Sequence, residues 1–272
     1  MSRRFDGRVL FLTGAAAASR KRLMGFGGAA AWRFLEEGGR GIVLTDVHDE
    51  LGEQAAAEMR EQGHDVLYQH LDVTDEEQWR EAVANTVEHF GRLDYLVNIA
   101  GILDAQSLLG VDTLVWKRTI EISTLGVFLG ARAVAQAMAR NGGGAIVNLS
   151  SMASKQGAGT YGTAYAFSRA GMINFTKSEA LQLAPLGIRV NAVSPGWVHT
   201  PFTDYLHTNP EQHAYRMGRV PLKRWGQPEE IAAGILFLLS DDASYVTGSE
   251  LLMDGGVSAG QYRPENPRSS ED

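Results

Sequence analysis

The chain has 272 residues, 44 % of them apolar, and a net charge of −7. That length and apolar content predict a single domain over residues 1–260, followed by a polar, flexible tail at 261–272. The acidic balance disfavours nucleic acid as a partner, because nucleic acid phosphates attract basic surfaces. The chain shows no run suited to a bilayer span and no secretory signal, so we expect a cytoplasmic protein without a membrane partner. The absence of cysteine excludes disulfides, and the histidine spacing predicts no metal site.

The first half of the chain alternates between predicted strands and helices. Apolar runs predict strands at 8–13, 41–45, 65–71 and 93–98. Apolar residues at helical spacing predict helices at 27–37, 49–62 and 74–90. Gly38 and Gly39 are typical of a helix end, and the acidic run after Thr74 is typical of a helix start.

The second half continues the alternation. We expect helices at 113–140, 163–183 and 228–239, and strands at 145–149, 187–193 and 250–253. Strands that alternate with helices pair in parallel, which predicts one doubly wound α/β sheet. Ligands of such sheets bind beyond the carboxyl ends of the strands. The side chains at those ends should therefore meet in one pocket; they are Thr13, Asp46, Asp72, Asn98, Ser151 and Ser194 to Gly196.

An acid/base centre is predicted around Tyr165. Arg169 follows it by four residues on a predicted helix, so the two side chains share a face. Ser151 ends the preceding strand and brings a hydroxyl to the same region. The alternative for the Tyr165–Arg169 pair alone is a surface aromatic–cation contact.

From Arg8 to about Gly256 the sequence resembles the short-chain dehydrogenases/reductases. The resemblance rests on Thr13-Gly14, Asp46, Asp72-Val73, Asn98 to Gly101, Ser151, Tyr165, Pro195-Gly196 and Asp254 to Gly256. It implies a Rossmann-like fold with a single doubly wound parallel sheet. In that family a serine holds a carbonyl and a tyrosine gives or takes the proton. A lysine four residues after the tyrosine binds the nicotinamide ribose, and an asparagine completes the proton relay.

Two side chains depart from that family pattern at the chemistry. Arg169 stands where the family has lysine, and arginine presents a flat fork of five donors that always keeps its charge. Such a cation still stabilises a phenolate. Ser123 stands where the relay asparagine is expected, three residues before Gly126.

The phosphate loop is a third departure. A dinucleotide loop needs glycines at fixed offsets, so that backbone N–H groups approach pyrophosphate at a helix start. Counted directly from Gly14, the expected glycines are replaced by an alanine and an arginine. A second alignment places them at Gly25 and Gly27 after seven inserted residues, and the offset from there to Asp46 favours it. We interpret the loop as rebuilt around an aromatic residue.

A serine, tyrosine and arginine set with a rebuilt loop resembles the halohydrin dehalogenases. These cofactor-free relatives close vicinal halohydrins to epoxides with halide release, and reopen epoxides with azide, cyanide or halide. The resemblance implies a homotetrameric carbon–halide lyase without a cofactor. Its base is Tyr165, its substrate-binding hydroxyl is Ser151, and Arg169 stabilises the phenolate. The implied halide and substrate pocket consists of Phe26, Pro195, Gly196, Trp197 and Ser123.

Two other functions stay open. An NAD-dependent short-chain alcohol dehydrogenase or ketone reductase would bind NAD at Gly14, Gly25, Gly27, Asp46, Asp72 and Asn98. A catalytically silent binding subunit is disfavoured, because Ser151 and Tyr165 are both present. The interval between those two residues is one longer than usual, so Ser150 and Ser154 remain alternatives for the catalytic serine.

Overall fold

The computed structural model of the protein describes residues 3–157 and 162–260, so the expected tail at 261–272 lies outside the described residues. Its strands are β1 (Val9–Thr13), β2 (Gly41–Asp46), β3 (Val66–His70), β4 (Tyr95–Asn98), β5 (Gly144–Leu149), β6 (Ile188–Pro195) and β7 (Glu250–Met253). Within the described residues they form one seven-stranded parallel sheet in the order β3-β2-β1-β4-β5-β6-β7. The predicted doubly wound, Rossmann-like fold is therefore confirmed.

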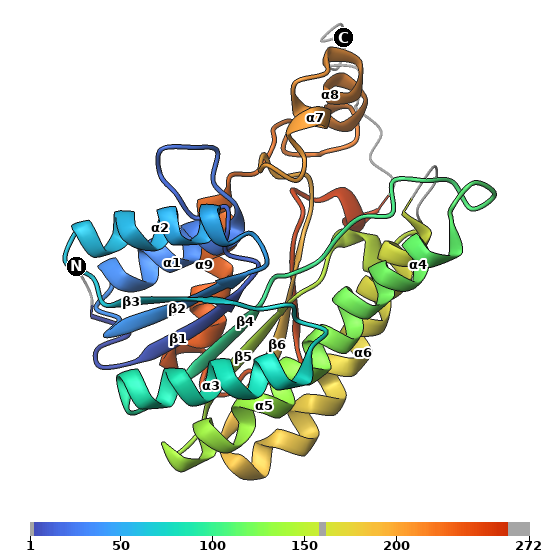
Figure 1. Ribbon diagram of the computed structural model, residues 1–272. Helices are drawn as coiled ribbons and strands as arrows, with labels where there is room; N and C mark the ends of the chain where they lie inside the picture. Colours follow the sequence, from blue (N-terminus) through green and yellow to red (C-terminus); the bar gives the residue numbers. More distant parts are fainter. Residues whose placement is uncertain (1–2, 158–161, 261–272) are drawn as a thin grey trace, which may run out of the picture.

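Helices cover both faces of this sheet. One face carries α1 (Phe26–Glu36), α2 (Asp49–Glu61) and α9 (Pro228–Leu239), and the other carries α3 (Glu76–Phe90), α5 (Gly126–Arg140) and α6 (Thr163–Leu183) (Figure 1). Because both faces are covered, the central strands are mostly apolar, and all five residues of β1 are buried. Short 3₁₀ turns lie at Met152–Ser154, Ala184–Leu186, Asp241–Ala243 and Val257–Ala259.

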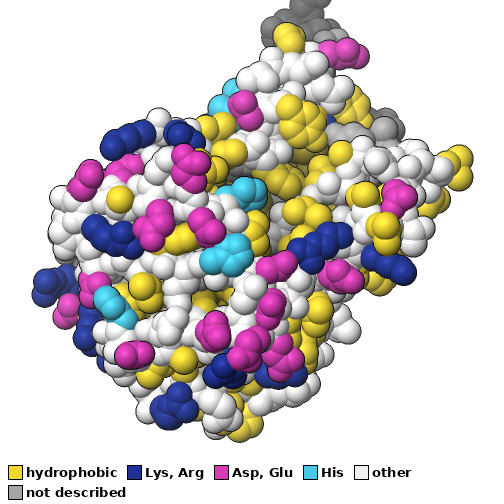
Figure 2. All heavy atoms as spheres, viewed as in Figure 1, with side chains coloured by type: hydrophobic (Ala, Val, Ile, Leu, Met, Phe, Trp, Pro, Cys, Tyr) yellow, Lys and Arg dark blue, Asp and Glu magenta, His cyan; other side chains and the backbone are white. Residues whose placement is uncertain are grey.

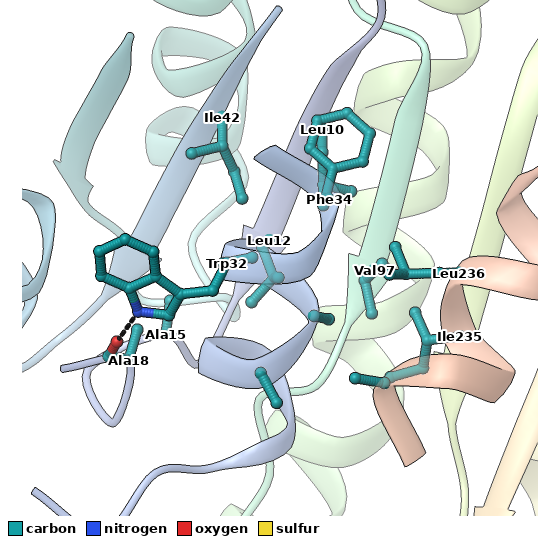
Figure 3. Packing of buried hydrophobic residues seen from close by; sticks show 14 of the residues in the cluster. Leu10, Leu12, Ala15, Ala18, Trp32, Phe34, Ile42, Val97, Ile235 and Leu236 are labelled. Carbon is teal, nitrogen blue, oxygen red and sulfur yellow. Dashed lines mark hydrogen bonds between the residues drawn. The ribbon is translucent and has the colours of Figure 1, made fainter. Parts of the chain in front are cut away.

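The core between the sheet and α1 holds that helix in place. Figure 3 shows Leu10 and Leu12 of β1 facing Trp32 and Phe34 of α1, and all four are buried. Burying side chains of this size contributes about 1.5–3 kcal/mol each. The Trp32 indole N–H donates to the backbone oxygen of Ala18, 2.8 Å away. This packing fixes where α1 begins relative to the strand ends.

The predicted long helix at 113–140 has an irregular centre. It consists of α4 (Thr113–Ile120), a π-helical turn at Glu121–Leu125, and α5. By length and composition the stretch Thr113–Arg140 is apolar enough to cross a membrane. However, 56 % of its most apolar window is buried inside the fold, as in a core helix of a soluble protein. Single π turns inside α-helices are frequent at functional sites.

Two short helices between β6 and α9 were not predicted. They are α7 (Asp204–His207) and α8 (Pro210–Met217), and they project beyond the carboxyl ends of the strands as a cap (Figure 1). Asn209 caps α8 by accepting from the backbone N–H of Gln212 at 3.0 Å, and Pro210 occupies the first helical position. The Asn-Pro pair was the signal in the sequence that we missed.

Candidate active site

A cavity of about 990 Å³ lies at the carboxyl ends of the strands, below the cap. Figure 2 shows hydrophobic side chains gathered where this face is hollowed between the cap and the body. Most predicted site residues line it: Gly14, Gly25, Phe26, Gly27, Asp46, Asp72, Ser151, Tyr165, Arg169, Pro195, Gly196 and Trp197. Four residues that were expected in the pocket are not among the described residues that line it: Thr13, Asn98, Ser123 and Ser194.

Three serines near the end of β5 differ in what their hydroxyls do. Ser151 begins the 3₁₀ turn Met152–Ser154 and accepts a backbone N–H from within that turn at 3.1 Å. Ser150 is buried and donates to a backbone oxygen of α6 at 2.9 Å, and Ser154 donates to Glu250 at 3.1 Å. Within the described residues, Ser151 is thus the serine whose O–H is left to donate into the cavity.

Tyr165 and Arg169 lie one turn apart on α6. The guanidinium carbon is 4.8 Å from the centroid of the tyrosine ring. Nη1 of Arg169 donates to the backbone oxygen of Leu149 at 2.6 Å, and the side chain is buried. On the other side, a Cβ at position 101 would overlap the guanidinium, so Gly101 is required for its placement. The cation is therefore held in a fixed position beside the phenol ring.

A buried carboxylate orients the start of α6. The N-cap position is Gly162, in the left-handed region at φ 86°, and it has no side chain to cap the helix. Asp104, which is 0 % exposed, accepts instead from the backbone N–H groups of Ala164 and Tyr165, each at 3.0 Å. A negative charge here also complements the positive end of the helix dipole. Asp104 was not predicted, because it lies 61 residues from Tyr165 in the chain.

The cap adds an apolar wall opposite the tyrosine. The ring of Phe202 lies 6.2 Å from that of Tyr165, centroid to centroid, at an interplanar angle of 31°. Trp197 and Leu206 line the same part of the cavity. Trp197 was predicted from its place after Pro195 and Gly196, whereas Phe202 follows no motif and was not predicted.

The opposite end of the cavity has the features of a phosphate site. The first residue of α1 is Phe26, its N-cap is Gly25, and its first turn has no acidic side chain. At Gly14, φ is +67° and a Cβ would come within 2.9 Å of the Ala100 backbone, so only glycine leaves room there. Free N–H groups at a helix start favour anions. These residues fit a pyrophosphate, and therefore a dinucleotide.

The inserted residues leave this phosphate site open. Of the segment 18–24, no residue lines the cavity. The segment turns outward: the hydroxyl of Ser19 donates to Glu58 on α2 at 2.7 Å, and the Arg20 guanidinium lies 4.1 Å from the Trp32 ring centroid. We interpreted the loop as rebuilt around an aromatic residue, which implied that no dinucleotide binds. That implication was wrong, because the extra length packs against the outside of α1 and α2.

Two carboxylates lie at the carboxyl ends of neighbouring strands: Asp46 ends β2, and Asp72 follows β3. Asp46 accepts the backbone N–H of Ala16 at 2.9 Å, which ties the phosphate loop to β2. Asp72 accepts from Arg118 at 2.8 Å and from the Thr74 hydroxyl at 2.7 Å. Burial acts to raise the pKa of Asp72, but these hydrogen bonds lower it overall. Both carboxylates are therefore acceptors at the cavity wall.

Two of these predicted residues, Asn98 and Ser123, are buried and do not line the cavity. Asn98 donates to Asn148 at 2.9 Å, which in turn donates to Glu179 at 2.7 Å, and all three are buried. Burial raises the pKa of Glu179 to about 8, against a smaller lowering by Asn148. Ser123 is buried in the π-helical turn, and its hydroxyl has no partner within the described part of the chain. Its predicted place in a substrate pocket was wrong.

Comparison with known proteins identifies the relatives. A family model described as enoyl-(acyl carrier protein) reductase matches residues 20–258. Cyclopentanol dehydrogenase of Comamonas testosteroni is 41 % identical, over 94 % of this chain and 99 % of that protein. Trans-4-hydroxycyclohexanecarboxylate dehydrogenase of Sinomonas cyclohexanicum is 40 % identical over 96 % of both chains. Gluconate 5-dehydrogenase of Burkholderia cenocepacia, solved with NADP and tartrate, has a TM-score of 0.86 at 29 % identity, over 95 % of this chain and 98 % of that one.

These relatives overturn part of what the sequence suggested. They are dehydrogenases and reductases rather than carbon–halide lyases, so the prediction of a halohydrin dehalogenase was wrong. The expectation of no cofactor was also wrong, since one structural relative was solved with NADP. The physical reason is that the glycines at the start of α1 survive the insertion. Because the family model matches residues 20–258, the chain belongs to the short-chain dehydrogenase/reductase superfamily.

Proposed function

We propose that the protein is an NAD-dependent alcohol dehydrogenase that interconverts a secondary alcohol and a ketone. One observation carries the proposal: a single cavity joins the start of α1 to Ser151, Tyr165 and Arg169. A long cofactor and a small substrate can therefore meet in it. The dehydrogenases among the relatives support the same reaction class.

The residues at the cavity wall support NAD rather than NADP. The N–H groups at the start of α1 would bind the pyrophosphate, and Asp46 would accept from the adenosine ribose. A carboxylate at that position repels a 2′-phosphate. Arg169 would face the nicotinamide ribose in place of the family's lysine. Its buried Nε has no hydrogen-bond partner among the described residues, a need that a bound hydroxyl or water would meet.

The chain's own side chains supply the proton chemistry. Bound nicotinamide supplies or accepts the hydride. In alcohol oxidation the Tyr165 phenolate takes the hydroxyl proton of the substrate, and in ketone reduction the phenol returns it. Ser151 donates its O–H to the substrate oxygen, where negative charge develops. Arg169 stabilises the phenolate, because its charge is permanent and the contacts to Leu149 and Gly101 fix it beside the ring.

The substrate is proposed to be a small alicyclic alcohol. The wall near Tyr165 is made by Trp197, Phe202 and Leu206, which suits a compact apolar ring. Relatives named for cyclopentanol and for a hydroxycyclohexane carboxylate support this class.

A nicotinamide absorbance assay tests the proposal. Cyclopentanol and cyclohexanol are offered with NAD or NADP, and the corresponding ketones with the reduced forms. We expect turnover with NAD that is lost in Tyr165→Phe, while that variant still binds NADH in a fluorescence titration. Absence of both turnover and NADH binding in the unmodified chain would overturn the proposal.

We also propose a cytoplasmic homotetramer. A nicotinamide-dependent enzyme needs a compartment that contains its cofactor, which supports a cytoplasmic location. Large apolar side chains stay exposed on the helices that cover one face, including Phe128 on α5 and Phe167 and Leu181 on α6. Exposed apolar groups on adjoining helices favour a contact between copies. Light scattering should give four times the chain mass; a monomer mass refutes the assembly.

A further inference from the structure

Three metal-ligating side chains meet on the cap, away from the residues that perform the proposed reaction. His199 lies in the loop after β6, and Asp204 and His207 are the first and last residues of α7. One ligand atom from each lies within 4.8 Å of the other two. Nε2 of His199 is 2.9 Å from Oδ1 of Asp204, and all three residues are partly buried. The sequence predicted no metal site, because these residues share no familiar spacing.

Backbone hydrogen bonds already hold the three residues together. Asp204 and His207 are three apart on one helical turn, so their side chains lie on the same face. The backbone N–H of His199 donates to Gly226 at 3.1 Å, which fixes the loop. Thr203 closes the turn between the loop and α7 by donating its hydroxyl to the backbone oxygen of Val198. Much of the entropy of assembling a site is therefore lost already on folding.

The geometry points to a site for one divalent ion of the zinc type, bound by His199, Asp204 and His207. Two imidazoles and one carboxylate form a typical three-ligand set for zinc, with a fourth position left to water. His199 and Asp204 form a hydrogen bond, and His207 packs edge-on against Trp225 with ring centroids 5.1 Å apart. His207 stacks on His199 with ring centroids 3.7 Å apart and an interplanar angle of 12°. Lone pairs of stacked rings point in parallel planes, so binding turns one ring about its χ2 until both face the ion.

An ion here would fasten the cap over the substrate end of the cavity. Between Asp204 and His207, the same turn carries Tyr205 and Leu206, which line the cavity. His199 lies on the loop that continues to Phe202, whose ring faces Tyr165. The ion would therefore link the loop after β6 to α7, which together form part of the wall around the substrate. It would touch neither Tyr165 nor the phosphate site. This inference is independent of the proposed reaction, because its test measures metal and stability.

The experiment uses the untagged full-length chain after treatment with a chelator. We expect equilibrium dialysis against micromolar Zn²⁺ to give one ion per chain by elemental analysis. A rise in the thermal midpoint should accompany binding, because an ion that binds the folded state stabilises it. His207→Gln should lose both the bound ion and the thermal shift. Asp204→Asn serves as a second variant if circular dichroism shows that the first fails to fold.

A matched control comes from a histidine–carboxylate pair elsewhere. On the surface, Nε2 of His89 lies 2.8 Å from Oδ1 of Asp65, and neither residue is part of the three-residue cluster. His89→Gln should keep one Zn²⁺ per chain and the full thermal shift. The site is refuted if the unmodified chain binds no stoichiometric ion, or if folded His207→Gln and Asp204→Asn bind zinc as the unmodified chain does.

Discussion

Replacing Asp104 with alanine should lower both stability and turnover, because the variant lacks the carboxylate that caps the start of α6. Two backbone N–H groups, those of Ala164 and Tyr165, would lose acceptors that are now 3.0 Å away. Hydrogen bonds to a charged group contribute about 1.5–3 kcal/mol each, and removal of an exposed cap costs about 0.5–2 kcal/mol. Since Asp104 is 0 % exposed, water cannot replace it easily, and we expect a loss of about 3 kcal/mol in the free energy of unfolding.

Urea denaturation measures this loss, and Asp75→Ala is the matched control. Asp75 also accepts two backbone N–H groups, at 2.9 and 3.1 Å at the start of α3, but water reaches that helix start. We expect about 1 kcal/mol there. Because Asp104 also positions the backbone of Tyr165, its variant should lower kcat about 10- to 100-fold without changing NADH affinity. Equal losses in the two variants would refute the argument that burial makes the Asp104 cap the stronger one.

Three further predictions concern the cation, the buried acid and the cofactor. Gly101→Ala sets a methyl group against the Arg169 guanidinium, so steady-state kinetics should show kcat about tenfold lower or worse, with the fold retained by circular dichroism. Burial raises the pKa of Glu179 to about 8, so the folded state binds this proton more tightly than the unfolded state does. The resulting contribution to stability is complete below about pH 4.5 and is lost as the pH rises through about 8. In urea denaturation, the free energy of unfolding of Glu179→Gln should therefore equal that of the unmodified chain near pH 4.5 and exceed it at pH 8. Asp46→Ala should shift the kcat/KM ratio toward NADP by about tenfold, as the repulsion of a 2′-phosphate is removed; an unchanged ratio would contradict the assignment.

The strands were predictable because a parallel sheet covered on both faces needs continuous apolar runs, and β1, β2 and β5 have them. The glycines at the start of α1 were also predictable, since the offset from Gly27 to Asp46 placed them correctly despite the insertion. Tyr165 and Arg169 needed only helical spacing. These features depend on residues near one another in the chain.

Features that depend on distant residues were not predictable. Asp104 caps a helix 61 residues away, and the cap helices are too short to have a strong pattern of their own. The outward course of the insertion depends on Glu58 and Trp32, which no local pattern links to it. The error in function came from three departures from the family pattern: Arg169, Ser123 and the inserted loop. Together they were taken to exclude a cofactor, although the features of a phosphate site are formed by backbone at the other end of the cavity.

The inserted segment 18–24 shows how a loop can vary in length next to an unchanged anion-binding helix start. Between Gly14 and Gly25 the connection is roughly three times the usual motif spacing, which costs only about 1 kcal/mol in closure entropy. Anchors at Glu58 and Trp32 offset that cost on the far side of the helix. Such an appendage gives evolution a place to add surface contacts without disturbing catalysis. A motif search that demands fixed intervals would pass over chains built in this way.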